Sequence, residues 1–531
     1  MSAKPDAVVI GAGHNGLACA CYLAKAGVRV LVLEAYGALG GMTLTEELTL
    51  PGFRSDVHAS GYQLANISPS PHELELDRHG LELIEPEVAW AHAFSDGDSI
   101  AIGGDLDKAV DAVARYSPGD AEAVRGLFER YRSERAGVIA SFFSPPPSFA
   151  DAAAAMESQP GGLDRYRESL QSMRAWCEQT FEDERTRCLF GAFAPFVGHG
   201  PDDAGGAEIA WLFASVLQAE GNKLVRGGMN RVTRAMAAYL ESRGGEVRTG
   251  ARVERIAVED GRATGVRLAG GEEIAARRLV AASVDPRQLV VTLLGAEVVG
   301  TEIAQKAERI EWGDSVLVIY LALDGPVSYA AGAEADRAAH VHLTAPSIDS
   351  MATAIDQARA GRLPDAPVIV AWNDSTIDPS RAPPGKALKK LVVLGVPYEI
   401  SGDATGNVGV GHWDEVGARY ADHVLAFVDE LYLPGLRERI LARAVHSPVD
   451  LERKLSSSVR GTIPHGAMVP HQTGFMRPIP ELAHYRSPVP NVYLCGSGTH
   501  PGAGVSMASG RNAAEVIYSD LGLDFDSLAT A

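Results

Sequence analysis

The chain has 531 residues, of which 46% are hydrophobic and 22% charged, a composition typical of ordinary soluble globular proteins. A chain of this length exceeds the size of one hydrophobic core, so we expect two or three domains. The formal net charge of −20 disfavours binding to the phosphate backbone of nucleic acids.

The cysteines and the apolar runs indicate the cellular compartment in which the protein is expected. The chain has five cysteines, an odd number without a CxxC pair, at positions 19, 21, 177, 188 and 495. This usage disfavours a disulfide framework or a zinc site and indicates the reducing cytoplasm. The amino terminus has no signal-peptide pattern, and no apolar run is long enough to span a membrane. We therefore expect a cytoplasmic protein that is soluble or at most peripheral to a membrane.

The first predicted elements are a buried strand, Ala7–Ile10, and a glycine-rich turn over residues 11–16 that matches GxGxxG. A helix over residues 17–26 and a second strand over 28–33 follow, and Glu34 ends this strand. Strand, turn, helix, strand and terminal acid thus occur in the order of a dinucleotide-binding βαβ unit.

Each part of this unit fits the binding of a dinucleotide. The three glycines permit the tight turn, the approach of the backbone to a pyrophosphate, and close packing of helix on strand. The free amides and dipole at the helix start favour negative charge, and the terminal carboxylate is placed to accept hydrogen bonds from ribose hydroxyls. The predicted site comprises Gly11, Gly13, His14, Asn15, Gly16 and Glu34.

The residues after the second strand favour FAD over NAD. Gly37 and the pair Gly40-Gly41 resemble the loop of glutathione-reductase-like and amine-oxidase-like flavoproteins that contacts the FAD diphosphate a second time. Ala38-Leu39 stands where most of those proteins have a basic residue. The stretch 51–56 then resembles the turn that leads toward the flavin ring. We therefore predict FAD as the cofactor.

Segments in the middle of the chain are predicted to belong to the same domain. A helix is predicted over residues 232–242, a hairpin over 253–268, and a strand over 274–282. By the same resemblance, the backbone near Val253 contacts adenine; alternatively, Val253 belongs to an ordinary alternating core strand.

Two long inserts separate the segments of the FAD-binding domain. The first, residues 71–220, is largely helical in pattern, and the second, 296–454, alternates helices with strands such as 315–323 and 391–396. Within the first, residues 141–149 form a proline-stiffened loop with three aromatic residues. That loop is either a rigid linker between helices, or a hydrophobic lid or membrane-touching lip at a substrate entrance.

Near the carboxy terminus, an apolar strand again feeds a glycine-rich turn, residues 496–504, and then a helix over 506–519. The positive end of this helix is placed to stabilise the negative charge that reduction builds on the flavin pyrimidine edge. The cofactor residues predicted in this closing segment are Gly496, Gly498, Gly504 and Val505.

Two motifs together, GAGHNGL at residues 11–17 and YLCGSGTHPGAGV at 493–505, resemble the phytoene desaturase family of carotenoid flavoproteins. The stretch 464–488 resembles that family as well. The resemblance implies an α/β fold in which a Rossmann-like FAD-binding domain of the glutathione-reductase or amine-oxidase type is interleaved with an α+β substrate domain. The FAD-binding domain then comprises residues 1–70, 221–295 and 455–531, and the substrate-binding domain with its helical lid comprises 71–220 and 296–454.

The family implies an FAD-dependent oxidoreductase that desaturates or oxidises a hydrophobic, polyene or isoprenoid substrate by hydride transfer to flavin N5. Two alternatives stay open: an amine oxidase-like flavoenzyme with a polar substrate, and a non-catalytic prenyl-binding protein of the Rab GDP-dissociation-inhibitor type. Gly409-Val410-Gly411 lacks the third glycine of a second fingerprint, so a separate NAD(P)H domain is not expected. Oxygen, a quinone or another external acceptor would reoxidise the flavin.

Several polar residues are candidates for catalysis. His500 lies in the turn that faces the expected flavin, where it positions the substrate, hydrogen-bonds the flavin, or only braces the turn. Arg477 orders the preceding loop or orients a polar end of the substrate. His465, His471 and His58 are candidate general bases. Their spacing matches no zinc signature, so we expect no metal.

Overall fold

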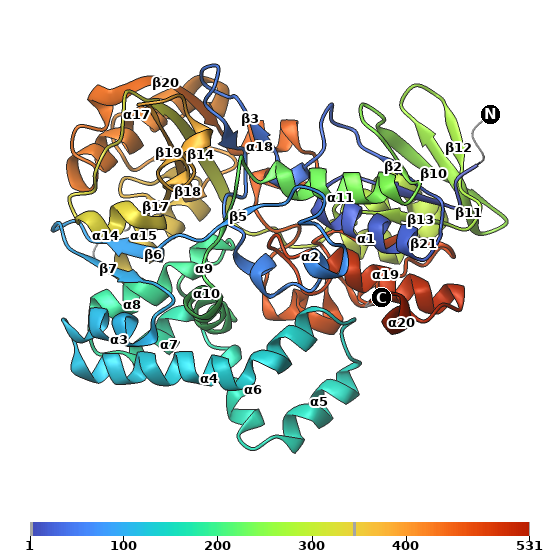
Figure 1. Ribbon diagram of the computed structural model, residues 1–531, viewed down its shortest axis with the longest axis horizontal. Helices are drawn as coiled ribbons and strands as arrows, with labels where there is room; N and C mark the ends of the chain where they lie inside the picture. The colour runs from blue at the N-terminus through green and yellow to red at the C-terminus, as the bar shows by residue number, and fades with distance from the viewer. Residues whose placement is uncertain (1–3, 344–346, 530–531) are drawn as a thin grey trace.

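The computed structural model describes residues 4–343 and 347–529. Figure 1 shows a parallel sheet with its helices on the right, a large mixed sheet at the upper left, and a group of helices below the large sheet. Within the described residues no helix is both long and apolar enough to cross a membrane.

The smaller sheet has five parallel strands in the order β21-β13-β1-β2-β9. Its strands are β1 (Ala7–Ile10), β2 (Val30–Leu33), β9 (Glu246–Arg248), β13 (Leu279–Ala282) and β21 (Val492–Leu494). Segments from the two ends and the middle of the chain therefore meet in one sheet. Alternate residues of the strands belong to two separate hydrophobic clusters, so both faces of the sheet are covered.

Helices cover one face of this sheet and a small antiparallel sheet covers the other. The helices are α1 (His14–Lys25), α11 (Asn230–Ser242) and α19 (Ala508–Leu521), and the strands are β10 (Val253–Glu259), β11 (Arg262–Leu268) and β12 (Glu273–Ala275). The prediction of one strand over 274–282 is wrong. The chain changes sheets there, because β12 pairs with β11 whereas β13 pairs with β1 and β21.

The larger sheet has seven strands in the order β20-β14-β18-β17-β15-β6-β7. They are β6 (Val88–Ala93), β7 (Ser99–Ile102), β14 (Ser315–Leu323), β15 (Ala338–Leu343), β17 (Val368–Trp372), β18 (Ala387–Val396) and β20 (Ile440–His446). All neighbours are antiparallel except β6 and β15. The first insert is thus not wholly helical, because it contributes β6 and β7 to the sheet of the second.

The two faces of the seven-stranded sheet have different partners. α17 (Trp413–Leu431) packs on one face, where its apolar side chains join those of the strands. The opposite face packs against helices of the first insert. These helices are α3 (Leu106–Ala114), α4 (Pro118–Phe142), α7 (Met173–Thr180), α8 (Glu184–Gly191), α9 (Phe193–Phe196) and α10 (Gly206–Glu220).

Two further helices, α5 (Phe149–Ser158) and α6 (Gly162–Ser169), extend away from the body at the bottom of Figure 1. The side-chain oxygen of Ser148 caps the start of α5 by accepting from the amide of Asp151. No residue of α5 is buried. We call residues 149–169 the α5–α6 arm.

Short elements complete the chain. They are α2 (Ser70–Glu73), β3 (Thr45–Glu46), β4 (Ser55–Asp56), β5 (Leu83–Ile84), β8 (Leu224–Val225), α12 (Ala296–Val299), α13 (Thr301–Glu308), α14 (Ala333–Arg337), α15 (Ile348–Arg359), β16 (Arg362–Leu363), α16 (Asp374–Ile377), β19 (Gly402–Asp403), α18 (Pro448–Lys454) and α20 (Phe525–Ala529).

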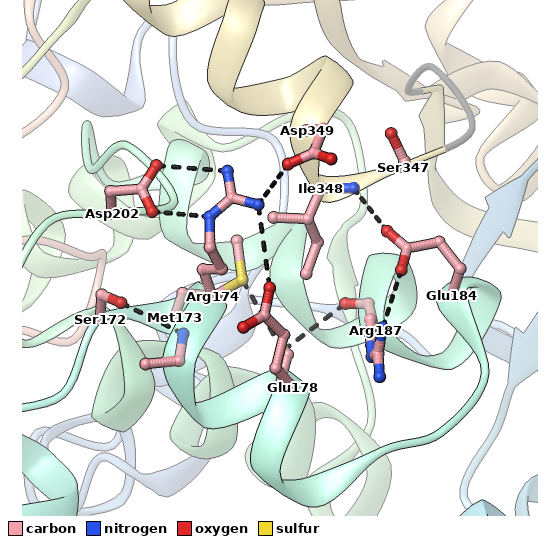
Figure 2. Close-up of polar contacts among 12 residues, drawn as sticks. Ser172, Met173, Arg174, Glu178, Glu184, Arg187, Asp202, Ser347, Ile348 and Asp349 are labelled. Carbon is pink, nitrogen blue, oxygen red and sulfur yellow. Dashed lines mark hydrogen bonds and ion pairs between the residues drawn. The ribbon is translucent and has the colours of Figure 1, made fainter.

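A polar network joins the helices of the first insert to α15 in the second (Figure 2). The Arg174 guanidinium on α7 pairs with Asp202 and with Asp349 in the first turn of α15. Glu184, the first residue of α8, accepts a hydrogen bond of 2.8 Å from the amide of Ile348. The network is partly exposed, so it fixes the orientation of α7 and α8 relative to α15 more than it adds to the free energy of unfolding.

A second charged cluster is fully buried and joins β4 to the seven-stranded sheet. Arg381, 1% exposed, pairs with Asp56 at 3.0 Å and lies 3.7 Å from Asp374. Asp56 also accepts from the amide of Met229 at 2.9 Å and from the Thr45 hydroxyl at 2.6 Å. The segment around Asp56 is therefore held from several sides.

Replacing Arg381 by Met should lower the free energy of unfolding by about 3–5 kcal/mol, because Asp56 and Asp374 would stay buried without their cation. The matched control is Arg226→Met, which removes an exposed pair with Glu82 and should cost less than about 1 kcal/mol. The shift of the urea unfolding midpoint, followed by circular dichroism, measures both. Equal shifts for the two variants would show that the buried cluster does not stabilise the fold.

Candidate nucleotide and substrate site

The fingerprint turn joins β1 to α1. Gly11 has a φ of +97°, a region that glycine tolerates, and its amide donates to the carbonyl of Leu33 at 2.8 Å. A Cβ on Gly16 would lie 2.1 Å from the carbonyl oxygen of Gly11, so a side chain there would push the helix off the strand. No side chain caps the first turn of α1 and no acidic residue lies in it, so its amides stay free for an anion.

Gly40 and Gly41 lie beside this turn. The amide of Gly40 donates to the carbonyl of Ala12 at 3.1 Å, and Gly40 forms a parallel bridge with Gly13. A Cβ on Gly41 would stand 3.2 Å from the Cα of Gly13. A Cβ on Gly13 itself would meet no protein atom closer than 3.9 Å. The space beside Gly13 is therefore open, and it belongs to a cavity that Gly13 lines.

This first cavity runs from the fingerprint turn to the end of β2. Glu34 lies in its wall, where one carboxylate oxygen accepts from the amide of Ala12 at 2.7 Å and the other from the amide of Tyr36 at 2.8 Å. These two bonds fix the carboxylate and leave further lone pairs for a ribose. The predicted cofactor residues that line the first cavity are Gly11, Gly13, His14, Asn15, Glu34, Gly41 and Val253.

Part of the same wall was not predicted. Residues 453–457, at the end of α18 and just after it, line the first cavity together with Tyr36 and Gln288. Lys454 is held there by Glu46 at 2.6 Å and by the hydroxyl of Tyr36 at 3.0 Å. No glycine pattern or residue spacing predicts that this segment lines the first cavity, because only tertiary packing brings it there.

A second cavity adjoins the first, because His14, Met42 and Ser497 line both. Its remaining wall is mostly apolar. The seven-stranded sheet contributes Val316, Val318, Trp372 and Val392, the helices contribute Phe196, and other segments contribute His58, Ala59, Ser60, Gly61, Gln63, Leu64, Ile463, Gly504 and Val505.

The closing turn packs directly on the fingerprint. The Nε2 atom of His14 lies 3.2 Å from the carbonyl oxygen of Gly504. A Cβ on Gly510, in α19, would lie 2.0 Å from the carbonyl oxygen of Asn15, so this glycine lets the two helices touch. Of the predicted closing residues, Gly504 and Val505 line the second cavity.

Gly496 and Gly498 line neither cavity. Both allow the closing turn to approach the segment after β13. A Cβ on Gly496 would lie 3.0 Å from the carbonyl oxygen of Val284, and one on Gly498 would lie 2.5 Å from Pro286. Their contacts therefore shape the turn that carries Ser497 into both cavities.

Arg477 is 1% exposed, and its guanidinium donates five hydrogen bonds to backbone carbonyls. The acceptors, at 3.0–3.2 Å, are Gly466, Ala467, Gln472, Ser497 and Thr499. Burial lowers the pKa of Arg477 to about 10. A guanidinium has five N–H groups, so these contacts leave none for a substrate. Arg477 orders the loop, which is one of the two roles considered for it.

His500, predicted to position the substrate, hydrogen-bond the flavin or brace the closing turn, lines neither cavity. Its Nε2 lies 2.7 Å from the carbonyl oxygen of Ser141 at the end of α4. Burial lowers its pKa to about 4, so the ring is neutral at neutral pH and donates to that carbonyl. Its contact braces the turn against the first insert.

The other histidines differ in position. His465 lines the first cavity, is 7% exposed, and has no hydrogen-bond partner on either ring nitrogen within the described chain. His58 lines the second cavity. His471 is exposed and lies 3.2 Å from Glu311. No three His, Cys, Asp or Glu side chains converge as metal ligands within residues 4–343 and 347–529.

Comparison with known proteins gives a family and a set of relatives. The family model described as flavin containing amine oxidoreductase matches residues 16–518. One of the subunits of limonene dehydrogenase from Castellaniella defragrans is 29% identical over 98% of this chain and 95% of its own. Hydroxyneurosporene desaturase of Cereibacter sphaeroides is 30% identical over 97% of this chain and 98% of its own.

A mouse protein named pyridine nucleotide-disulfide oxidoreductase domain-containing protein 2 is also 30% identical, over 97% of this chain and 94% of its own. Among solved structures, an oxidoreductase from Methanosarcina mazei superposes with a TM-score of 0.63 at 18% identity, covering 97% of this chain and 99% of that one. That likeness establishes the fold class predicted from the motifs, an α/β flavoprotein fold of the amine-oxidase type.

Replacing Gly13 by Val should abolish incorporation of FAD. The new side chain would meet no protein atom closely, so the chain should fold, but it would project into the first cavity beside the free amides of α1. The matched control is Gly126→Val, at an exposed position of α4 where a Cβ likewise meets nothing within 4 Å and which lies outside the cavity lining. The ratio of flavin to protein absorbance measures incorporation. Stoichiometric flavin in the Gly13 variant would place the pyrophosphate elsewhere.

Proposed function

The chain belongs to the flavin-containing amine oxidoreductase family and is an FAD-dependent oxidoreductase, and we propose that it desaturates or oxidises a hydrophobic polyene or isoprenoid substrate. The observation that carries the proposal is the apolar second cavity, which adjoins the nucleotide cavity through His14, Met42 and Ser497. Relatives named as part of a limonene dehydrogenase and as a hydroxyneurosporene desaturase support a hydrocarbon-like substrate.

The residues of the first cavity fit FAD. We propose that the free amides after Gly13 hold the pyrophosphate, that Glu34 binds a ribose, and that the backbone of Val253 contacts adenine. Asn15 Oδ1 is buried without a partner among the described residues, as expected of a group that meets a cofactor. Gly504 and Val505 then face the flavin. When bound, FAD supplies the two-electron acceptor for the hydride removed from the substrate.

The chain itself contributes the shape and polarity of the substrate site. Valines from the sheet, with Phe196 and Trp372, exclude water from the second cavity. In the described chain no carboxylate lines it, so the ammonium of an amine substrate would be buried without a counter-charge. This disfavours the amine oxidase alternative. The intact nucleotide cavity disfavours a non-catalytic prenyl-binding protein.

The remaining parts of the proposal concern domains and electron flow. We propose that residues 1–70, 221–295 and 455–531 form the FAD-binding domain and that 71–220 and 296–454 form the substrate-binding domain. Oxygen or a quinone is the proposed external electron acceptor. A cytoplasmic location is supported by the five cysteines, which are all buried and free.

We propose peripheral membrane contact through the α5–α6 arm. Phe149, Leu163 and Tyr166 are 66%, 63% and 45% exposed, which is unusual for large apolar side chains gathered on one small element. The root of the arm is tied to the closing segment: Asn512 donates to the carbonyls of Phe142 and Ser144. A membrane-bound arm would bring a lipid-dissolved substrate close to the flavin domain.

Anaerobic mixing of the holoprotein with a panel of compounds tests the substrate class. Isoprenoid and polyene hydrocarbons should bleach the oxidised flavin absorbance, whereas primary amines of similar size should leave it unchanged, because the second cavity offers an ammonium no carboxylate. Dithionite serves as the positive control for a reducible flavin. Bleaching by amines alone would favour the amine oxidase alternative instead.

The double variant Phe149→Ser, Leu163→Ser should bind phosphatidylcholine vesicles at least about tenfold more weakly than the wild type, since burying each side chain contributes roughly 1.5–3 kcal/mol. Leu441→Ser, a 46% exposed position on β20, is the control and should bind like the wild type. Co-sedimentation with vesicles measures binding. Unchanged binding of the double variant would exclude the arm as the contact.

A further inference from the structure

Desaturation removes two hydrogens from neighbouring carbons. One leaves as a hydride with the electron pair of its C–H bond, for which bound FAD would supply the acceptor. The other leaves as a proton, and the electron pair of its C–H bond becomes the new C=C bond. This proton needs an acceptor within reach of the substrate. The following inference rests on the proposed function and concerns that acceptor.

The second cavity offers few acceptors. In the described chain only two residues that line it have titratable side chains, His14 and His58. His14 belongs to the fingerprint, and its Nε2 already contacts the carbonyl of Gly504. The Nε2 of His58 is buried and has no hydrogen-bond partner in the described chain. Of the two histidines that line the second cavity, His58 is therefore the one whose Nε2 is available to accept a proton.

The backbone around His58 is fixed from two strands of the seven-stranded sheet. Lys390 on β18 donates to the carbonyl of His58 at 2.6 Å and to that of Asp56 at 3.3 Å. Tyr320 on β14 donates from its hydroxyl to the carbonyl of Val57 at 2.5 Å. A ring carried by so constrained a segment keeps its place in the cavity wall, as a catalytic group requires.

The competing histidines lie elsewhere. His465 lines the first cavity but not the second, which places it on the cofactor side. His500 lines neither cavity and donates to the carbonyl of Ser141. His471 is exposed at the surface beside Glu311. The cavity that each histidine lines thus distinguishes His58 from His465, His471 and His500.

We propose that His58 is the catalytic base, whose Nε2 accepts the proton that the substrate releases as its hydride leaves for FAD.

Burial keeps the ring of His58 neutral before the reaction. Its pKa is lowered to about 3, chiefly by burial and to a smaller extent by His446 on β20, Lys390 on β18, Lys454 at the end of α18 and His465. The carboxylates nearby are engaged, Asp56 by Arg381 and Glu46 by Lys454. A weak base suffices here, because a C–H bond beside a carbon that is losing hydride is strongly acidic.

The test measures anaerobic flavin reduction in a stopped-flow instrument, with a hydrocarbon that bleaches the wild-type flavin. His58→Gln should reduce its flavin at least about a hundredfold more slowly, a typical loss for a removed general base, with unchanged FAD content. Deuterium at the carbon that loses the proton should give a larger isotope effect in this variant than in the wild type. His484→Gln, an exposed position, is the matched control.

A second variant distinguishes the loss of a catalytic base from misfolding. His58→Ala should be equally slow, and added imidazole should restore part of its rate, which a purely structural role would not allow. Wild-type rates in both variants, or a loss of rate in His465→Gln alone, would overturn the role of His58 and leave the proposed function intact. A wild-type flavin that no hydrocarbon reduces would overturn the proposed function, and the role of His58 with it.

Discussion

The site depends first on one buried cation. Arg477 has no carboxylate partner in the described chain, and burial is the cause of its lowered pKa. Burying a charge in this way is costly unless hydrogen bonds offset it, and here five carbonyls do so. The bonds join the loop at Gly466 and Ala467 to the closing turn at Ser497 and Thr499. Because Ser497 lines both cavities, the Arg477 side chain fixes the boundary between the first cavity and the second.

The nucleotide cavity is built from both ends of the chain. His14 and Gly504 are 490 positions apart, yet their contact closes the fingerprint against the last glycine turn. Close packing makes this possible, since Gly510 leaves room for the carbonyl of Asn15. The same closing segment holds the first insert, through His500 on Ser141 and Asn512 on Phe142. The end of α4 in the first insert is therefore in direct contact with the closing segment beside the cavities.

The substrate cavity takes its character from the seven-stranded sheet. One face of that sheet is covered by α17, and the other turns valines and Trp372 toward the cavity. Its polar side comes from the segment after β4, which the buried pair of Asp56 and Arg381 holds in place. The apolar wall thus faces a polar side that includes His58, a division suited to the proposed hydrocarbon substrate, which must lose a hydride and a proton.

The sequence by itself determined the glycine turn beside the first cavity. Gly11 and Gly16 could be predicted because a tight turn and a closely packed helix each demand glycine at a set spacing, and the same fingerprint predicts Glu34 as the ribose acceptor. The boundaries of β1, α1 and α11 followed from local patterns to within a few residues. The motifs near the two ends were sufficient for the cofactor and the family, since both belong to continuous stretches of chain.

Only the tertiary structure decided which of the scattered polar residues meet. The sequence ranked His500 with His465 and Arg477, but packing turned His500 toward Ser141 and used every N–H of Arg477 on backbone carbonyls. It also brought residues 453–457 to the wall of the first cavity and placed His58 in the wall of the second. These contacts join segments far apart in the chain, so no local spacing encodes them; they follow from how the two sheets and their helices pack.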